Sequence, residues 1–221
     1  MSSHLAREVE RLKKKLLELS TTVEENVHRA VRAVLDKDES LADAAIRFDP
    51  KIDQMEVEVE EDCLKILALY HPVAIDLRFI ISVLKINNDL ERIGDLSTNI
   101  AARAKSLARL ANSDTESNLE QMSELVQGML RDSLSALIRL DLKLAQKVCN
   151  SDQAVDELNR ETYKRAHKEI LKHPGSVKKM FFYVSVSRNL ERIADLATNI
   201  AEDVIYMIDG EIVRHRIMTI D

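Results

Sequence analysis

Two twelve-residue segments of the sequence place acidic and amide side chains at the same helical spacing. LERIGDLSTNIA occupies residues 90–101 and LERIADLATNIA occupies residues 190–201, with ten of the twelve positions identical. An α-helix advances about 100° per residue, so residues four apart lie along one side of it. Each segment therefore presents a strip of oxygen-bearing side chains opposite its leucines and isoleucines. The strip consists of Glu91, Asp95 and Asn99 in the first segment and of Glu191, Asp195 and Asn199 in the second.

These strips have the chemistry of a cation site. Carboxylates four residues apart repel one another and weaken a helix by a few tenths of a kcal/mol, about 0.2–0.5 per pair. A bound cation would remove this repulsion, and carboxylate and amide oxygens suit hard cations such as Mg²⁺, Mn²⁺ or iron. A solvated helix face is the alternative, with Arg92 and Arg192 as ion-pair partners. The duplication of the whole segment favours the cation site.

A second acidic pair accompanies each strip. Asp49 and Asp53 stand where a second helix resumes in the first half, and Asp152 and Asp156 occupy the same place in the second half. If the helices of each half pack antiparallel, four carboxylates converge in each half. Asp49 and Asp152 serve equally well as helix N-caps, because aspartate is a preferred N-cap residue.

The two copies differ at their edges. Position 88 is asparagine in the first copy, whereas the second copy has Arg188. Glu202 and Asp203 replace the alanine and arginine that follow the first copy. The two sites are therefore expected to differ in their ligands.

Composition favours long helices. The chain has 221 residues, of which 32% are charged, with only 4 glycines and 3 prolines. Good helix formers dominate and helix breakers are scarce. A hydrophobic fraction of 45% is sufficient for a packed core. The net charge of −6 disfavours a nucleic-acid-binding protein, because such proteins carry a basic surface.

Targeting and redox features indicate a cytoplasmic protein. The N-terminal residues are charged and contain no apolar signal region. The longest apolar run, FIISVL at residues 79–84, is far too short to span a bilayer. Cys63 and Cys149 each lie within an apolar helical pattern, so we expect two reduced thiols in the core rather than a disulfide.

Apolar periodicity predicts three helices in the first half, at Leu5–Leu35, Leu41–Tyr70 and Val73–Ala108. The second of these is expected to be interrupted at Asp49 and Pro50, with Asp49 as N-cap and Pro50 at the first position of a renewed helix. In the second half, one long helix is expected at Leu119–Val148. A cap at Asn150–Gln153 should then start a helix that runs to Leu171, and the last helix should cover Val177–Ile208.

The two halves read as one repeated unit. A His-Pro pair precedes the helix with the duplicated segment in each half, at residues 71–72 and 173–174. The polar linker NSDTES at residues 112–117 separates the halves. The expected fold is all-α, with two pseudo-symmetric antiparallel three-helix bundles at residues 1–111 and 117–210 and a C-terminal tail at 211–221.

The sequence resembles the PhoU family of phosphate-signalling regulators. The resemblance rests on VAIDLRFI at residues 73–80, on NDLERIGDLSTNIA, and on the closing stretch RNLERIADLATNIAEDVIYMIDGEIVRH at residues 188–215. It covers nearly the whole chain. It implies the same pair of three-helix bundles and a cytoplasmic protein that is commonly a homodimer. The triplet Asp76-Leu77-Arg78 has no counterpart in the second half, which departs from the repeat there.

The resemblance further implies function, partners and ligands. Family members repress the phosphate-starvation response by linking a phosphate ABC transporter, through its ATPase subunit, to a sensor histidine kinase. Membrane contact would then occur only through these partners, and nucleic acid is not expected as a partner. Acidic motifs of the family bind metal ions, including iron or zinc clusters. The matching positions here are Glu91, Asp95, Glu191 and Asp195, followed by Asp49, Asp53, Asp152 and Asp156.

A metalloenzyme and a purely structural scaffold are the two alternative classes of function. A carboxylate-bridged metalloenzyme, a hydrolase or an oxidase, could use four carboxylates per half, but the sequence offers no evident nucleophile, histidine ligand or phosphate-binding loop. A purely structural helical scaffold does not explain the duplicated acidic segment. The expected function is therefore a metal-binding negative regulator of phosphate uptake that is not an enzyme.

Overall fold

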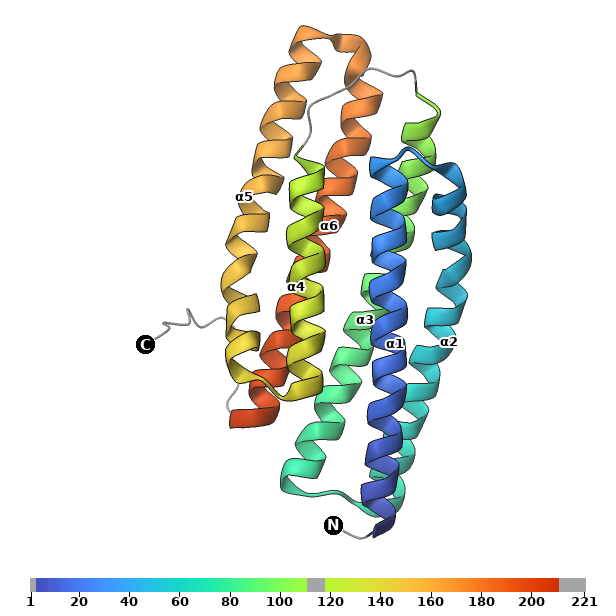
Figure 1. The fold of residues 1–221 in the computed structure, drawn as a ribbon, viewed down its shortest axis with the longest axis vertical. Helices are drawn as coiled ribbons and strands as arrows, with labels where there is room; N and C mark the ends of the chain where they lie inside the picture. Colours follow the sequence, from blue (N-terminus) through green and yellow to red (C-terminus); the bar gives the residue numbers. More distant parts are fainter. Residues whose placement is uncertain (1–2, 111–117, 211–221) are drawn as a thin grey trace.

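A computed structural model describes residues 3–110 and 118–210 of the chain (Figure 1). Over these residues the protein consists of six α-helices and one short 3₁₀ turn, without β-strands, which confirms the expected all-α fold. None of the helices in this part of the chain is long and apolar enough to cross a bilayer. The elements are α1 (Ser3–Leu35), α2 (Glu39–Tyr70), α3 (Ala74–Ala108), α4 (Leu119–Arg139), α5 (Leu142–Lys172), the 3₁₀ turn η1 (Pro174–Ser176) and α6 (Val177–Asp209).

The helices form two pseudo-symmetric antiparallel bundles that share one hydrophobic core. In the first bundle α1, α2 and α3 contact one another, and in the second α4, α5 and α6 do so. The bundles meet where α3 packs against α6 and where α1 packs against α4 (Figure 1). The expected boundaries at 111 and 117 and the tail at 211–221 lie outside the described residues, so the division into these units stays a prediction.

The second helix is not interrupted, contrary to the expectation from its proline. Helix α2 runs continuously with Pro50 inside it, and its N-cap is Asp38, which accepts from the backbone N–H groups of Ser40 and Leu41 at 2.7 and 3.1 Å. A proline in a helix removes one backbone hydrogen bond. Buried residues on both sides of Pro50, including Ala45 and Ile52, belong to one apolar stripe, and their packing holds the helix together.

The first turn of the second half also lies elsewhere than expected. Helix α4 ends at Arg139 and α5 begins at Leu142, so the predicted helix at 119–148 is wrong, as is the predicted cap at 150–153. Leu140 adopts a left-handed conformation with φ of 50°, and Asp141 caps α5 by accepting from the N–H of Leu144 at 3.1 Å. The turn contains neither glycine nor proline, so no helix-breaking residue marks it in the sequence.

Two pseudo-equivalent polar contacts join the bundles. The Nζ atom of Lys85 on α3 lies 3.1 Å from Oδ1 of Asp203 on α6, and Asp203 is only 2% exposed. One hundred residues along, the roles of the helices exchange: Nε of Arg103 on α3 donates to Oγ of Ser185 on α6 at 3.2 Å. The two contacts therefore occupy equivalent positions in the repeat, but one is an ion pair and the other is a hydrogen bond.

Replacement of Leu140 by glycine should stabilise the protein. A left-handed conformation costs a side-chain-bearing residue about 1–2 kcal/mol, and this leucine is 55% exposed, so little burial is lost. We expect Leu140→Gly to raise the free energy of unfolding by about 0.5 kcal/mol in urea titrations. Lys37 has φ of 53° in the equivalent turn, and Lys37→Gly should act in the same direction. Arg139→Gly, one residue earlier and helical, should destabilise; a gain from that control would contradict the argument.

Removal of the buried carboxylate between the bundles should destabilise the protein. Asp203→Ala leaves the Lys85 ammonium without its buried partner, and we expect a loss of about 1–3 kcal/mol in the free energy of unfolding. Ser185→Ala removes only the neutral hydroxyl of the equivalent contact and should cost about 0.5–1 kcal/mol. Equal losses in the two variants would show that the charge at position 203 contributes nothing.

Candidate functional site

The two duplicated segments lie in the middle of α3 and α6, which pack against each other. The apolar side of each is fully buried: Leu90 and Ile93 on α3 and Leu190 and Ile193 on α6 are at most 1% exposed. The polar strip of each segment is thereby directed away from the core. The neighbour of the strip on α3 is α2, and that of the strip on α6 is α5.

The first acidic cluster joins α2 and α3. Burial raises the pKa of Glu91, and the negative charges of Asp95, Asp53, Glu56 and Asp49 raise it further. The pKa of Asp49 is likewise raised, first by burial. These five carboxylates act on one another electrostatically, so the structure brings together all four sequence-predicted acids of this half and adds Glu56.

The second acidic cluster joins α5 and α6. Burial and the nearby carboxylates of Asp195 and Asp156 raise the pKa of Asp152 to about 6. The pKa of Asp195 is also raised to about 6, by loss of hydration among the packed helices and by Glu191 and Asp156, although the residue as a whole is exposed. That of Glu191 is raised by burial and by Asp156. The four acids predicted for this half therefore also lie together.

Neither Asp49 nor Asp152 is a helix N-cap. Asp49 lies well inside α2 and Asp152 well inside α5, while the caps of these helices are Asp38 and Asp141. The N-cap alternative is therefore wrong. The expectation that the four carboxylates of each half meet at the start of a helix is also wrong. The clusters form between the middles of antiparallel helices, not between the start of one helix and the end of another.

A hydroxyl neighbour distinguishes the two clusters. Thr98 Oγ1 donates to Asp49 Oδ1 at 3.0 Å, and this hydrogen bond partly offsets the raised pKa of Asp49. In the second bundle the equivalent Thr198 Oγ1 is buried and has no hydrogen-bond partner among the described residues. An oxygen without a partner thus lines the same groove as Asp152 and Asp195.

The charged residues around the clusters also differ. In the first bundle Asn87 Nδ2 donates to Oε1 of Glu56 at 3.0 Å. The residues at these places in the second bundle are Asn159 and Ser187, and Ser187 Oγ donates to Asn159 Oδ1 at 2.7 Å. The second cluster therefore lacks the fifth carboxylate. The expected difference in ligands, which rested on positions 88 and 188 and on Glu202 and Asp203, stays a prediction.

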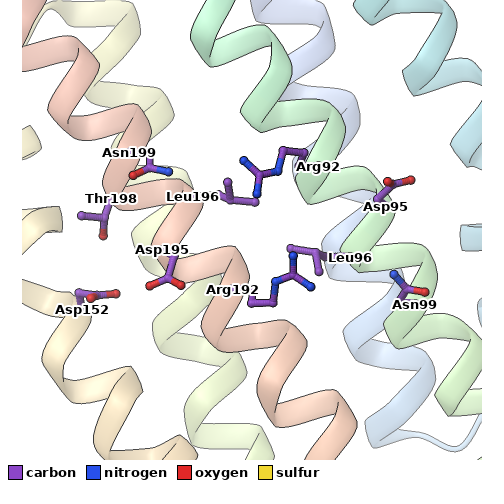
Figure 2. Close-up of a pocket in the computed structure, with 10 residues that line it drawn as sticks. All are labelled: Arg92, Asp95, Leu96, Asn99, Asp152, Arg192, Asp195, Leu196, Thr198 and Asn199. Carbon is purple, nitrogen blue, oxygen red and sulfur yellow. The ribbon is translucent and has the colours of Figure 1, made fainter. Parts of the chain in front are cut away.

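A groove of about 470 Å³ runs between the two clusters, over the contact of α3 with α6 (Figure 2). The guanidinium of Arg92 reaches from α3 toward α6, and that of Arg192 reaches from α6 toward α3, while Asp152 and Asp195 lie together on the far side of α6 (Figure 2). The groove is lined by Arg92, Asp95, Leu96, Asn99, Asp152, Arg192, Asp195, Leu196, Thr198 and Asn199. Asn99 and Asn199 therefore belong to the groove, beside the acidic clusters.

The clusters fit a hard cation in the kind of ligand and in charge. Their donors are carboxylate oxygens, and their pKa values are raised first by burial and then by the negative charge of the neighbouring carboxylates. Over residues 3–110 and 118–210, no three histidine, cysteine, aspartate or glutamate side chains converge closely enough to hold an ion in their present orientations. Cation binding would therefore require rotation of the carboxylates, and it stays a prediction.

Both cysteines of the described residues are thiols rather than thiolates while no metal is bound. Cys149 is a free thiol, and burial together with the charges of Glu202 and Asp152 raises its pKa to about 11. Cys63, also free and buried, has its pKa raised to about 12. Both cysteines are therefore protonated at neutral pH in the metal-free protein, whereas the carboxylates of the clusters ionise without the help of a metal.

Sequence reasoning missed Glu56 and the position of the two arginines. Glu56 follows Asp49 by seven residues and Asp53 by three, which places it on the same side of α2. This spacing was a usable signal. Arg92 and Arg192 were considered as ion-pair partners of the strips, but their reach across the groove depends on the packing of α3 against α6, which no local pattern specifies.

Known proteins resemble this chain over nearly its full length. The sequence model of the PhoU domain matches twice, at residues 16–104 and 119–204. The chain belongs to the PhoU family. The "Phosphate-specific transport system accessory protein PhoU homolog" of Aquifex aeolicus is 39% identical over 212 residues, covering 96% of each chain. The homolog of the same description from Pseudomonas putida is 38% identical over 97% of this chain and 84% of its own.

Solved structures of the family agree. The crystal structure of PhoU from Pseudomonas aeruginosa superposes with a TM-score of 0.91 at 36% identity, covering 93% of this chain and 99% of that one. The phosphate transport system regulatory protein PhoU from Streptococcus pneumoniae gives a TM-score of 0.84 at 31% identity, covering 95% and 99%. The PhoU family is described by accessory and regulatory roles, so this member is not an enzyme, as expected, and the metalloenzyme alternative is set aside.

The acidic clusters should make the protein less stable as the pH rises from about 4 to about 6. The folded-state pKa of Asp152 and of Asp195 lies near 6, above the ordinary value of 3.8, so the folded state binds more protons in this window. Stability is greatest at the acidic end and is lost as the two carboxyls ionise. Because Asp195 is solvent-exposed, screening reduces the effect, and we expect about 1 kcal/mol from the pair.

Urea titrations at pH 4.5 and 6.5, without added metal, measure this dependence. Asp152→Asn should flatten it, because the variant has no carboxyl to ionise at position 152. The control is the same substitution at Asp132 on α4, which lies outside both clusters and pairs with Lys147. An Asp152→Asn variant whose stability falls with pH as steeply as that of the wild type would contradict the raised pKa of this carboxyl.

Proposed function

We propose that this PhoU family member is a cation-binding negative regulator of phosphate uptake and of the phosphate-starvation response. The observation that carries the proposal is the 39% identity, over 96% of each chain, with a phosphate-specific transport system accessory protein. The relative from Streptococcus pneumoniae is described as a regulatory protein of phosphate transport. We propose as partners of this chain the ATPase subunit of a phosphate ABC transporter and a sensor histidine kinase, which the chain contacts in the cytoplasm as a homodimer.

The architecture supports a protein that contacts two partners. Long helices packed in two pseudo-symmetric bundles present broad faces on both sides of the α3–α6 contact. Simultaneous contact with a transporter and a kinase makes each interaction depend on effective concentration, so two weak contacts suffice for a reversible signal. Weak, polar contacts suit a surface on which charged side chains predominate.

The acidic clusters supply the cation dependence. Iron, manganese, magnesium or zinc would be held by Glu91, Asp95, Asp49 and Asp53 in the first bundle and by Glu191, Asp195, Asp152 and Asp156 in the second. When bound, the cation supplies positive charge that removes the repulsion between neighbouring helices. The protein's own residues orient the oxygens and hold the seams between α2 and α3 and between α5 and α6 together.

Genetics tests the regulatory proposal. Deletion of the gene should leave the phosphate-starvation genes expressed in phosphate-rich medium, and the wild-type gene supplied in trans should restore repression. Measurement of a starvation-dependent reporter decides the outcome. Repression that persists in the deletion strain, with no second copy of the gene, would exclude a negative regulatory role.

Thermal unfolding tests the metal proposal separately. A cation at 100 times its dissociation constant stabilises the folded state by about 2.7 kcal/mol. For a chain of this size, that raises the melting temperature by roughly 5–10 °C. Chelator-treated protein with added Mn²⁺ or Fe²⁺ should show this increase, and Asp95→Ala and Asp195→Ala should each reduce it.

The same variants should fold without metal, since they remove clustered negative charge. Asp132→Ala, outside the clusters, is the control and should retain the full increase. Elemental analysis of protein purified without chelator or affinity metal then identifies the ion. Identical melting of wild type and both cluster variants, with and without metal, would mean that the clusters bind no cation.

A further inference from the structure

The turn between α5 and α6 forms one end of the molecule and projects beyond the other helices at the top of Figure 1. Apolar side chains protrude from it. Leu171, in the last turn of α5, is 71% exposed, and Phe181, one turn into α6, is 63% exposed. Val177, between them, is exposed as well. Apolar side chains this exposed at a protruding end indicate a surface that contacts an apolar phase or partner.

Basic residues are frequent in the same part of the sequence. Residues 164–179 contain six lysines and arginines and one acidic residue, Glu169. Three of the lysines, Lys168, Lys172 and Lys178, have no carboxylate oxygen within 4.0 Å among the described residues; Lys164 and Arg165 pair with acids on α5 instead. The chain as a whole carries a net charge of −6, so this end is positive on an otherwise acidic protein.

The equivalent end of the first bundle provides an internal comparison. The turn between α2 and α3 also exposes apolar side chains, including Leu69 at 70% and Ile75 at 67%. Its residues 61–79, however, contain three acidic and two basic residues. The apolar character is therefore shared by the two ends, whereas the positive charge belongs to the α5–α6 turn alone. The two ends are therefore expected to contact different partners, and only the α5–α6 turn has the positive charge that attracts an anionic surface.

We propose that the α5–α6 turn docks directly on the surface of an anionic lipid bilayer. Leu171, Val177 and Phe181 enter the interfacial region, and the lysines contact the lipid phosphates while their aliphatic stems lie along the apolar boundary. A bilayer adapts to protruding apolar side chains, whereas an acidic protein partner would have to present a surface complementary in shape as well as in charge. This contact is additional to the expected attachment through partner proteins, and it does not depend on the proposed regulatory function.

Vesicle flotation with the full-length chain tests the proposal. The protein should float with vesicles of phosphatidylcholine and phosphatidylglycerol, remain in solution with phosphatidylcholine alone, and dissociate as salt is raised. Lys178→Glu should weaken binding to the anionic vesicles about tenfold or more, because a positive charge at the surface becomes a negative one. Phe181→Ser should also weaken it while preserving the salt dependence.

Matched variants at the other end are the controls. Ile81→Ser and Lys65→Glu make comparable changes near the α2–α3 turn, where Ile81 is 36% exposed and Lys65 pairs with Glu61 and Asp62. They should leave vesicle binding within twofold of wild type. Circular dichroism confirms that all four variants fold.

Failure of the wild-type protein to float with anionic vesicles would overturn the proposal, as would equal loss in the control variants. If Lys178→Glu and Phe181→Ser alter the oligomeric state and leave flotation unchanged, the α5–α6 turn is a contact between copies of the chain and the bilayer proposal is wrong.

Discussion

The packing of α3 against α6 is the constraint on which the remaining structure depends. These helices carry the two copies of one segment, and each must bury its leucines and isoleucines in the core that the two bundles share. Burial of that side fixes the rotation of both helices about their axes. With that rotation, the acidic strip of α3 lies against α2 and the acidic strip of α6 lies against α5. Two charged clusters and a groove between them follow from one repeated apolar pattern.

The position of the clusters has an energetic consequence. Glu91 and Asp152 lie in partly buried seams, where neighbouring carboxylates and loss of hydration both raise the pKa of an acid. A solvated helix face would not show this combination. The protein therefore carries local repulsion in the middle of two helix pairs, while the apolar core on the opposite side of the same helices keeps them in place.

The sequence specifies the helical fold and most of the acidic clusters, and its failures have identifiable causes. The apolar periodicity predicts six helices because it is a local signal, and the repeat supports the same number in each half. Pro50 misled the prediction, since a proline normally marks a boundary, yet tertiary packing holds α2 through it. Leu140 carries no signal of its own, because a leucine rarely adopts a left-handed conformation.

The repeat contained the missing information about that turn. Asp38 and Asp141, the caps of α2 and α5, are related by the offset of 103 residues that also relates Asp49 to Asp152. Alignment of the halves at this offset would have placed the second turn correctly. The groove is different in kind: the approach of Arg92 and Arg192 results from how two bundles pack, and this packing is not encoded in any single segment.

Pseudo-symmetry in this molecule conserves position more strictly than chemistry. Lys85 with Asp203 and Ser185 with Arg103 occupy equivalent places and differ in charge. The acidic clusters follow the same rule, since a hydrogen bond from Thr98 partly relieves Asp49, whereas Thr198 gives Asp152 no such relief. At a pH near 6 the second cluster retains protons that compete with a cation. If both clusters bind the same ion, this competition makes binding by the second cluster the more dependent on pH, because a proton and a cation compete for the same oxygens.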